Sequence, residues 1–346
     1  MPSTLRAPIS DCQPARMMDM RLSLLLLAIL PALAESPSDR IGTIDFYGYG
    51  HLDLASLRAA LPLKEGDTVP SDAVRASAEA AVSRVAGRQA AFSHVCCLED
   101  GRTSLYVGLP EVGAPPVVYN AAPQGTVRLP ADVMRIFGRF DKDFWGAVKR
   151  GKSSEDDSQG YALFEDPASR ADQLKLRDWT RAHNAMALRV LAESRDSGQR
   201  AYAAQALGYA DRSPAQIAAL VAAAFDSDDG VRNNAVRALE VLCTVGAEVT
   251  RQIPAPRFIP LLHSLTWTDR NKGAMLFMNM TASRDPELLR LLHDEALEPL
   301  REMAQWKDSG HAWASLRILG RMGGIEESRL DRLDASLVGE VLRAAR

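Results

Sequence analysis

Hydrophobic and polar residues alternate in three short stretches near the N-terminus. Between the first stretch and the second, the hydrophobic residues recur with the spacing of a helix. Gly48 and Gly50 provide a turn after the first stretch, and residues 99–102 have the composition of a hairpin turn. Asp53 and Ser71 are residue types that cap helices. The pattern predicts a strand, two helices and two strands, at residues 41–47, 54–61, 71–85, 90–98 and 104–109. We therefore expect a small βααββ domain over residues 41–111.

From residue 168 onward the pattern is helical throughout, and part of it occurs twice. Residues 200–208 align with residues 232–240, at an offset of 32 residues. The matching positions hold arginine, alanine, alanine and leucine, namely Arg200, Ala203, Ala206 and Leu207, then Arg232, Ala235, Ala238 and Leu239. A helix–turn–helix unit that recurs at about this length is typical of an α-solenoid. We expect an all-α solenoid over residues 168–346 with atypical units at its ends, so that the fold class is α+β overall.

The alanines and leucines of each copy lie three and four residues apart, as one buried face of a helix does. We therefore expect Ala235, Ala238 and Leu239 to face the interior between helices. Later units are more degenerate. In them, residues 257–262 resemble the second helix of a unit, and residues 271–280 and 312–320 resemble first helices.

Residues 112–167 connect the two predicted regions. Their first part is rich in proline, glycine and alanine and is expected to be a linker, and a helix is expected after Pro130. Residues 149–160 contain a stretch, 153–158, without any apolar residue. This composition predicts a mobile, acidic surface loop, and its spacing lacks the glycine and the terminal glutamate of a calcium-binding loop.

The apolar run at residues 22–30 has the features of a secretory signal peptide. Arg21 precedes the run, and Ala32-Leu33-Ala34 follows it as a small-residue cleavage site. The run is shorter than the roughly 20 residues that a membrane span needs. We expect cleavage between Ala34 and Glu35, a signal peptide at residues 1–34, and a mature chain in the periplasm or secreted, without a membrane span. The polar residues 1–19 before it are interpreted as a mis-annotated extension.

Length and composition exclude several classes of protein. The chain has 346 residues, of which 47% are hydrophobic and 25% are charged. It is thus apolar enough to form cores in two or more domains and is not disordered overall. Its 41 Lys and Arg are balanced by 44 Asp and Glu, for a formal net charge of −3. Without a basic excess, no nucleic-acid partner is expected.

Three cysteines remain after the predicted cleavage, and they cannot all pair within one chain. Cys96 and Cys97 alternate on a predicted strand and are interpreted as small hydrophobic residues. The sequence leaves open whether they are bridged, free or metal-bound. His94 lies on the same face of this strand as Cys96, so that His94, Cys96 and Cys97 are weak candidates for a soft metal site. Such a site would need another ligand. Cys243 ends an apolar helix and is expected to be a buried thiol.

No local motif assigns a catalytic or cofactor-binding residue. The sequence contains no H-E-x-x-H, G-x-S-x-G or paired C-x-x-C motif. Gly48-x-Gly50 lies between a predicted strand and a predicted helix, but Asp53 stands where a dinucleotide-binding motif has its third glycine. We interpret both glycines as turn residues, and we expect no cofactor.

Three phrases in residues 41–111 carry a family resemblance: Ile44-Asp45-Phe46-Tyr47-Gly48, Leu57-Arg58-Ala59-Ala60-Leu61 and Lys64-Glu65-Gly66-Asp67. With the order of elements, they resemble a polypeptide-transport-associated (POTRA) domain. The resemblance implies that this domain contacts client polypeptides by adding a strand at the edge of its sheet.

Residues 213–242 carry a second resemblance. Pro214-x-x-Ile217-x-x-Leu220 is followed by aspartates and then by Val231-Arg232-x-x-Ala235-x-x-Ala238-Leu239. This pattern resembles the HEAT-like repeats first grouped with phycobilisome lyases. The resemblance implies that Arg232 packs between units and meets an aspartate of the preceding turn, Asp228 or Asp229. The alternative for Arg200 and Arg232 is a basic stripe that binds a partner.

Together these features predict an exported, non-catalytic scaffold for protein interactions. It would bind a protein or polypeptide partner through the solenoid surface, and through a sheet edge of the α/β domain. The alternative is an envelope enzyme, or a metal- or cofactor-dependent accessory factor of the HEAT-like lyase kind. An enclosed pocket with convergent polar groups would favour the alternative.

Overall fold

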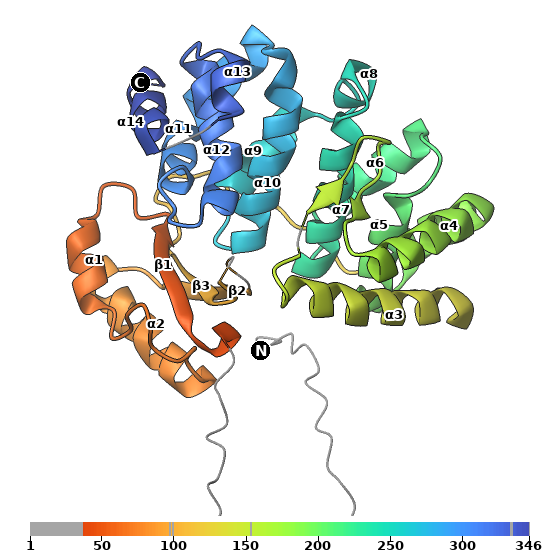
Figure 1. Cartoon of the computed structure of the whole chain (residues 1–346), viewed down its shortest axis with the longest axis horizontal. Helices are drawn as coiled ribbons and strands as arrows, with labels where there is room; N and C mark the ends of the chain where they lie inside the picture. Colours follow the sequence, from red (N-terminus) through yellow and green to blue (C-terminus); the bar gives the residue numbers. More distant parts are fainter. Residues whose placement is uncertain (1–36, 97, 99, 153, 333–334, 346) are drawn as a thin grey trace, which may run out of the picture. The chain divides into compact units, whose positions relative to one another are not determined.

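The structure of the chain is a computed structural model that describes residues 37–345 except 97, 99, 153, 333 and 334. The predicted signal peptide, the cleavage site between Ala34 and Glu35, and Cys97 lie outside the described residues. Within the described part, a small three-stranded sheet is followed by helices (Figure 1), which confirms the α+β class.

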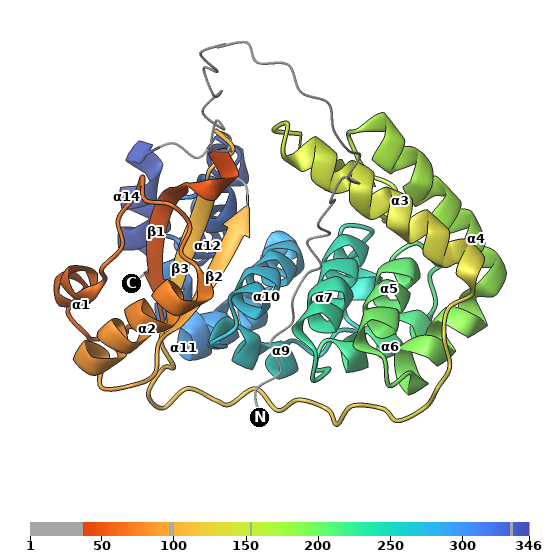
Figure 2. The same ribbon diagram turned by 90° about the horizontal axis from the view of Figure 1, so that it is seen from below.

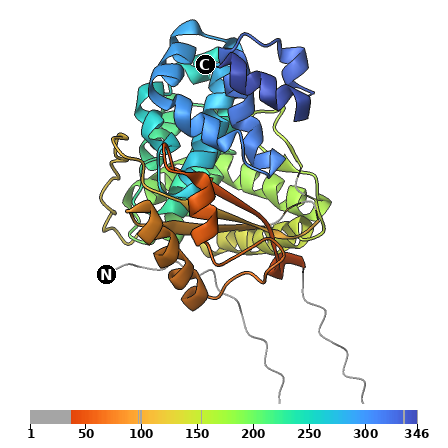
Figure 3. The same cartoon turned by 90° about the vertical axis from the view of Figure 1, so that its left-hand side faces the viewer.

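The N-terminal sheet contains β1 (Ile41–Tyr47), β2 (Ala91–Cys96) and β3 (Thr103–Gly108) in the order β1-β3-β2. Strand β3 is central. It pairs in parallel with β1 and antiparallel with β2. Two helices, α1 (Leu54–Ala60) and α2 (Asp72–Ala86), lie on one face of this sheet (Figure 3). Asp53 caps α1 by accepting hydrogen bonds from the backbone N–H groups of Ala55 and Ser56, as its residue type predicts.

The two faces of the sheet belong to different cores. Ile44 and Phe46 face α1 and α2, where they pack with Leu57 and other buried side chains. Tyr47 and Tyr106 instead belong to the core formed by the helices of residues 131–345. Because both faces are covered by apolar contacts, the sheet is buried between two layers of helices.

An extended segment, residues 109–130, connects the sheet to the first long helix (Figure 2). This predicted linker is anchored to the helices by backbone hydrogen bonds. The N–H of Asn120 donates to the carbonyl of Phe225 at 2.6 Å, and Gly125 forms an isolated bridge with Ser194. We refer to residues 109–130 as the strap.

The remaining chain is helical except for one short hairpin. Its elements are α3 (Ala131–Val148), β4 (Glu155–Asp156), β5 (Leu163–Phe164), α4 (Pro167–Glu193), α5 (Ser197–Leu207), α6 (Pro214–Ala223), α7 (Asp229–Cys243), α8 (Ala247–Thr250), α9 (Ala255–Leu262), α10 (Trp267–Met280), α11 (Pro286–Met303), α12 (Ser309–Met322), α13 (Glu327–Leu330) and α14 (Ala335–Ala344). The polar stretch predicted to be a loop thus contributes β4, which pairs with β5.

Helices α5, α7, α10 and α12 pack against one another in chain order and form a row, while α6, α9 and α11 pack against the row (Figure 2). Helix α10, which contains residues 271–280, and α12, which contains residues 312–320, stand in the same row as α5 and α7. Helix α9, which contains residues 257–262, packs against α10 as α6 packs against α7.

The alanine and leucine positions of the repeated segment are all buried within this row. Ala203, Ala206, Leu207, Ala235 and Leu239 are fully enclosed, and Ala238 is 7% exposed. Small side chains at these places allow the backbones of α5 and α7 to approach closely, because a larger side chain would hold the two helices apart.

Candidate functional site

Three buried arginines occupy equivalent positions in the row of helices. Arg200, Arg232 and Arg270 are each the fourth residue of their helix, in α5, α7 and α10. Each donates a hydrogen bond to the backbone carbonyl six residues before it, over 2.8, 2.9 and 2.6 Å respectively. The three residues are at most 3% exposed. Because they are enclosed, they form no basic stripe on the surface.

The first two arginines bind carboxylates at the start of the next helix in the row, Asp226 in the turn before α7 and Asp269 in the first turn of α10. Arg200 donates from Nε and Nη2 to Asp226, over 2.8 and 2.7 Å, and Arg232 donates in the same way to Asp269. The expectation that Arg232 meets Asp228 or Asp229 was therefore wrong. The long side chain of Arg232 reaches beyond its own turn to Asp269. Asp228 instead caps α7, because its carboxylate accepts a hydrogen bond from the N–H of Val231.

The third arginine binds a carboxylate from the N-terminal region. Arg270 donates to Glu111, which follows β3 at the start of the strap. The other carboxylate oxygen of Glu111 lies 2.5 Å from Nδ1 of His263. Burial raises the pKa of Glu111, but the hydrogen bond to His263 and the charge of Arg270 outweigh it, so that the pKa is below its usual range.

A second carboxylate links the same arginine to the turn after β1. Glu302 of α11 lies 3.8 Å from Nη1 of Arg270 and accepts hydrogen bonds from the N–H groups of Gly48 and Gly50, over 2.5 and 2.8 Å. Gly48 has a φ of +70°, and a Cβ there would lie 1.9 Å from the carbonyl oxygen of Leu109. These glycines therefore serve a turn that presents its N–H groups to Glu302.

Aromatic side chains surround this buried ionic cluster. Tyr106 of β3 packs against Trp267 and Trp306, with ring centroids 5.1 and 4.8 Å apart. The Tyr106 hydroxyl lies 2.5 Å from Nδ1 of His311, and the Tyr47 hydroxyl donates to the carbonyl of Leu265 at 2.7 Å. The junction between sheet and helices thus combines apolar burial with hydrogen-bonded polar groups, but Nη1 of Arg270 and Nε1 of Trp267 have no hydrogen-bond partner among the described residues.

The outer edge of β1 is closed by other parts of the chain. The N–H of Ile41 donates to the carbonyl of Asp67, and the carbonyl of Ile41 accepts from Gly66, both at 2.8 Å. Further along, the N–H of Ile44 donates to the carboxylate of Glu65, and the carbonyl of Phe46 accepts from the indole of Trp306. These contacts leave little of this edge available to another strand.

The outer edge of β2 is less covered than that of β1. The backbone N–H of Phe92 on this edge donates to the carboxylate of Glu79 in α2, over 2.9 Å. Because hydrogen-bonding direction alternates along an antiparallel strand, the N–H and the carbonyl of His94 point outward like those of Phe92. Among the described residues, no strand or bridge pairs with this edge. His94 itself is exposed.

The weak metal candidates lie at this same edge. Cys96 is disulfide-bonded, so its sulfur is not a thiolate, and Cys97 lies outside the described residues. In the part of the chain that the structure describes, no group of three or more His, Cys, Asp and Glu could hold a metal ion. Cys243 is a free, buried thiol whose pKa is raised to about 12 by burial.

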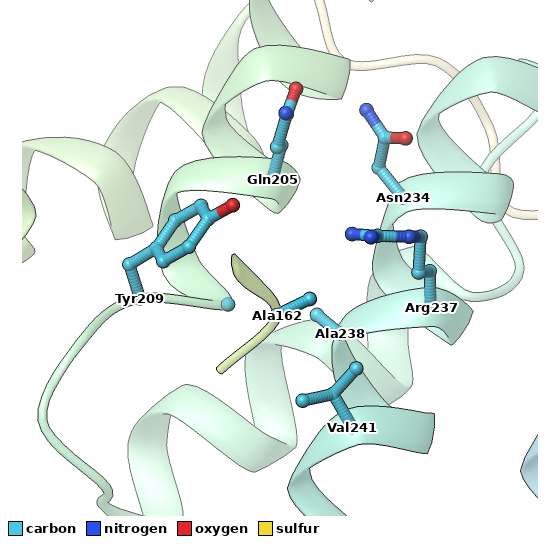
Figure 4. A pocket seen from close by; sticks show the side chains of 8 residues that line it. Ala162, Gln205, Tyr209, Asn234, Arg237, Ala238 and Val241 are labelled. Atoms are coloured by element: carbon cyan, nitrogen blue, oxygen red, sulfur yellow. The ribbon is translucent and has the colours of Figure 1, made fainter. Parts of the chain in front are cut away.

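A small pocket lies between α5 and α7 (Figure 4). Polar side chains of Gln205, Tyr209, Asn234 and Arg237 line it, and Arg237 forms an ion pair with Glu155 of β4. The accessible volume is about 20 Å³, which is room for about one water molecule. This pocket is therefore too small for a substrate.

The sequence did not reveal the residues that organise the junction and the free edge, namely Glu79, Glu111, Arg270 and Glu302. For Arg270 the sequence did contain a signal, because this arginine directly precedes residues 271–280, which were assigned to a repeat unit. Glu111 and Glu302 had none, since their hydrogen-bond partners lie more than 150 residues away in the chain.

Comparisons with known proteins add little to this description. No family model matches the chain, and no curated protein matches it. The crystal structure of an engineered protein is similar over 62% of this chain and 95% of that chain, with 18% sequence identity and a TM-score of 0.38. This likeness is too weak to inform fold or function. Within residues 37–345 apart from the gaps noted above, no helix is both long enough and apolar enough to cross a membrane.

Proposed function

We propose that this chain is an exported, non-catalytic interaction protein that binds an extended polypeptide at the outer edge of β2. In this proposal residues 41–111 are a POTRA-like domain and residues 168–346 are a HEAT-like α-solenoid. The observation that carries the proposal is the difference between the two sheet edges: in the part of the chain that the structure describes, other segments close the edge of β1, and no strand or bridge pairs with the edge of β2.

The arginine series supports the solenoid. Three helices of one row carry arginine as their fourth residue, and each arginine binds the carbonyl six residues earlier. The arginine position of the repeated segment thus recurs in a third helix, at a spacing of 38 residues in place of 32. In α12 the fourth residue is Ala312, which agrees with an atypical unit near the end of a solenoid.

The order of elements supports the POTRA-like domain. A strand, two helices and a hairpin build a sheet with the hairpin strand β2 at one edge and β1 at the other. An extended peptide added to β2 would form main-chain hydrogen bonds with the outward groups of His94, as in other cases of strand addition. Glu79 occupies the N–H of Phe92 and would have to be displaced at that end.

Export is supported by the sequence pattern of residues 21–34, which lie outside the described residues, and by the disulfide at Cys96. Disulfides persist in oxidising compartments and are rare in the cytosol. A periplasmic or secreted location is therefore part of the proposal.

Peptide selection followed by hydrogen exchange tests the proposal. Peptides selected from a random display library against the mature protein should protect the amide of His94 when bound. His94→Pro should weaken their binding at least tenfold, because proline removes the outward N–H and is tolerated at an edge. Glu79→Ala should strengthen it by freeing the N–H of Phe92.

Two outcomes would overturn the proposal. One is that the selected peptides protect only amides of the helices. The other is that His94→Pro binds them as tightly as the unmodified protein does. Arg84→Gln, an exposed change on the same helix as Glu79, is the matched control and should leave binding unchanged.

A further inference from the structure

Helix α3 buries its apolar side chains on one face and leaves the opposite face uncovered. Val133, Phe137, Phe140 and Ala147 are buried, and α3 packs against α4. Figure 1 shows α3 at the lower border of the helical region, with α4 above it. The exposed residues of α3 recur with helical spacing on the other side of the helix. This outer side of α3 is therefore available to a partner.

One tryptophan is exposed near the end of α3. Trp145 is 51% exposed, and its ring packs edge-on against the half-buried Phe144, with centroids 5.2 Å apart. Lys142 and Lys149 are three residues before it and four residues after it, so their side chains lie beside the ring on the helix surface. Both lysines are exposed. The tryptophan ring thus lies between two cations that face the solvent.

A third lysine is brought to the same place by the turn that ends α3. The N–H of Lys152 donates to the carbonyl of Ala147 at 3.1 Å, and Gly151 has a φ of +76°, which allows the chain to turn back there. Lys152 is exposed as well. We call the following four residues the lysine–tryptophan patch: Lys142, Trp145, Lys149 and Lys152.

Unpaired lysines give this patch a positive charge. Residues 131–152 contain six Lys and Arg and three Asp. Two of these cations, Arg139 and Arg150, pair with the buried carboxylates of Asp172 and Asp166. In the part of the chain that the structure describes, the three lysines of the patch form no ion pair and no side-chain hydrogen bond.

The three aspartates of this segment are engaged or lie away from the patch. Asp141 accepts a hydrogen bond from a tyrosine hydroxyl of α5 at 2.5 Å. Asp132 lies in the first turn, at the far end of α3. Asp143 is half-buried and projects away from Trp145, because residues two apart on a helix do not share a face. The local excess of positive charge is therefore carried by the three lysines.

The acidic residues 155–157 follow closely in the chain but are held by other elements. Glu155 and Asp156 form ion pairs with arginines of α7 and α4. Asp157 is close enough to Glu240 of α7 for their charges to interact. These carboxylates are thus directed toward α4 and α7, and the patch keeps its positive charge.

An exposed tryptophan among lysines fits the surface of an anionic membrane. Tryptophan is favoured at the level of the lipid headgroups, and each lysine near an anionic leaflet contributes about a factor of five in affinity. The convex face of a helix encloses no ligand, but it can lie on a planar surface.

We propose that the lysine–tryptophan patch binds the surface of membranes that contain anionic phospholipids. The Trp145 ring lies among the headgroups, and the three lysines bind the phosphates. The proposal is independent of peptide binding at β2.

Flotation of the mature protein with vesicles tests this proposal. The partition coefficient should be at least tenfold higher on phosphatidylcholine vesicles with about 40% phosphatidylglycerol than on phosphatidylcholine alone, because only the former carry a negative surface charge. Raising the salt concentration from about 0.05 M to about 0.5 M should remove most of this preference, because salt screens the lysines.

Variants locate the site. Lys142→Gln, Lys149→Gln and Lys152→Gln should each weaken binding to the anionic vesicles about three- to fivefold. Lys64→Gln is the matched control, because it removes an exposed lysine of the N-terminal domain and should leave binding unchanged. Trp145→Ala should weaken binding at least threefold, because the apolar contact with the headgroup region is lost.

Quenching by brominated phosphatidylglycerol reports the position of the ring. It should reduce part of the tryptophan emission of the unmodified protein, and Trp145→Phe should abolish this effect, because the other four tryptophans are buried or half-buried.

The proposal is overturned by equal partition onto neutral and anionic vesicles, by lysine variants that bind like Lys64→Gln, or by unchanged quenching in Trp145→Phe. Full competition by heparin, together with unchanged vesicle binding in Trp145→Ala, would also overturn it, because the patch would then be a site for soluble polyanions.

Discussion

The second and the third buried arginines of the helical row make the same backbone contact but bind different parts of the chain. Arg232 donates to Asp269, 37 residues away, in the next helix of the row. Arg270 donates to Glu111, 159 residues away, at the end of the N-terminal sheet. The position within the helix fixes where the guanidinium lies. The origin of the carboxylate then decides whether the arginine joins two helices or joins the helices to the sheet.

This comparison explains how the sheet is oriented on the helices. At Arg232 the carboxylate belongs to the regular succession of helices, and the pair is enclosed under Tyr119 of the strap, 4.1 Å from the guanidinium carbon to the ring centroid. At Arg270 the equivalent ring is Tyr47 of β1, at 4.7 Å. We call each buried arginine with its carboxylate and its covering tyrosine ring an arginine socket. The ring at Arg232 comes from the strap, and the ring at Arg270 comes from the sheet.

Substituting the two arginines should give the largest effects. Arg232→Met leaves the buried carboxylate of Asp269 without its cation, and Arg270→Met removes the cation beside Glu111 and the buried Glu302. Each substitution should cost about 3–5 kcal/mol of unfolding free energy. Urea denaturation measures the loss. Hydrogen exchange should localise it to α7 and α10 for Arg232→Met, and to β1 and β3 as well for Arg270→Met.

Arg84→Met, an exposed change without a contact in the described residues, should alter stability by less than about 0.5 kcal/mol. If both arginine variants loosened the same segments, the distinction between the two sockets would be wrong.

Ala235→Leu should have an intermediate effect, about 1–3 kcal/mol, because the added side-chain volume overpacks a fully buried position between helices. Hydrogen exchange should show loosening around residues 200–260 and little change in the sheet. Ala222→Leu, at an exposed position of α6, is the matched control. Uniform loosening of the whole molecule, or no change in either variant, would contradict the assigned row of helices.

Asp45→Asn should have the smallest effect and the opposite sign. Burial raises the pKa of Asp45 from 3.8 to about 6, against the opposing influence of the Lys307 N–H and the nearby cations. The folded state thus binds this proton more tightly than the unfolded chain, so the contribution of Asp45 to stability falls as pH rises from about 4 to about 6. The asparagine variant should be about 1–2 kcal/mol more stable at pH 7.

Urea denaturation between pH 4 and pH 7 measures this difference. Asp72→Asn, whose side chain is 85% exposed, should leave the pH profile unchanged. A loss of stability in Asp45→Asn at pH 7 would mean that the charge of Asp45 is needed at the junction.

Local features of this fold could be predicted from the sequence, and long-range contacts could not. Alternation at residues 41–47 and the capping residue Asp53 predicted β1 and α1, because both signals act over a few residues. The repeated pattern found Arg200 and Arg232, but Arg270 follows Trp267-Thr268-Asp269, which lacks the glycine of the two earlier copies. The difference between the edges of β1 and β2 depends on which segments of the folded chain reach each edge, and no local pattern encodes that.

A double-mutant cycle between Glu111 and Arg270 tests most directly whether the sheet is held by the arginine socket. Unfolding free energies are measured for Glu111→Gln, Arg270→Met and the double variant. The structure predicts a coupling energy of at least about 1.5 kcal/mol, because the two side chains form one buried ion pair. A coupling energy below about 0.5 kcal/mol would mean that the two residues act independently and that the sheet is held by its other contacts.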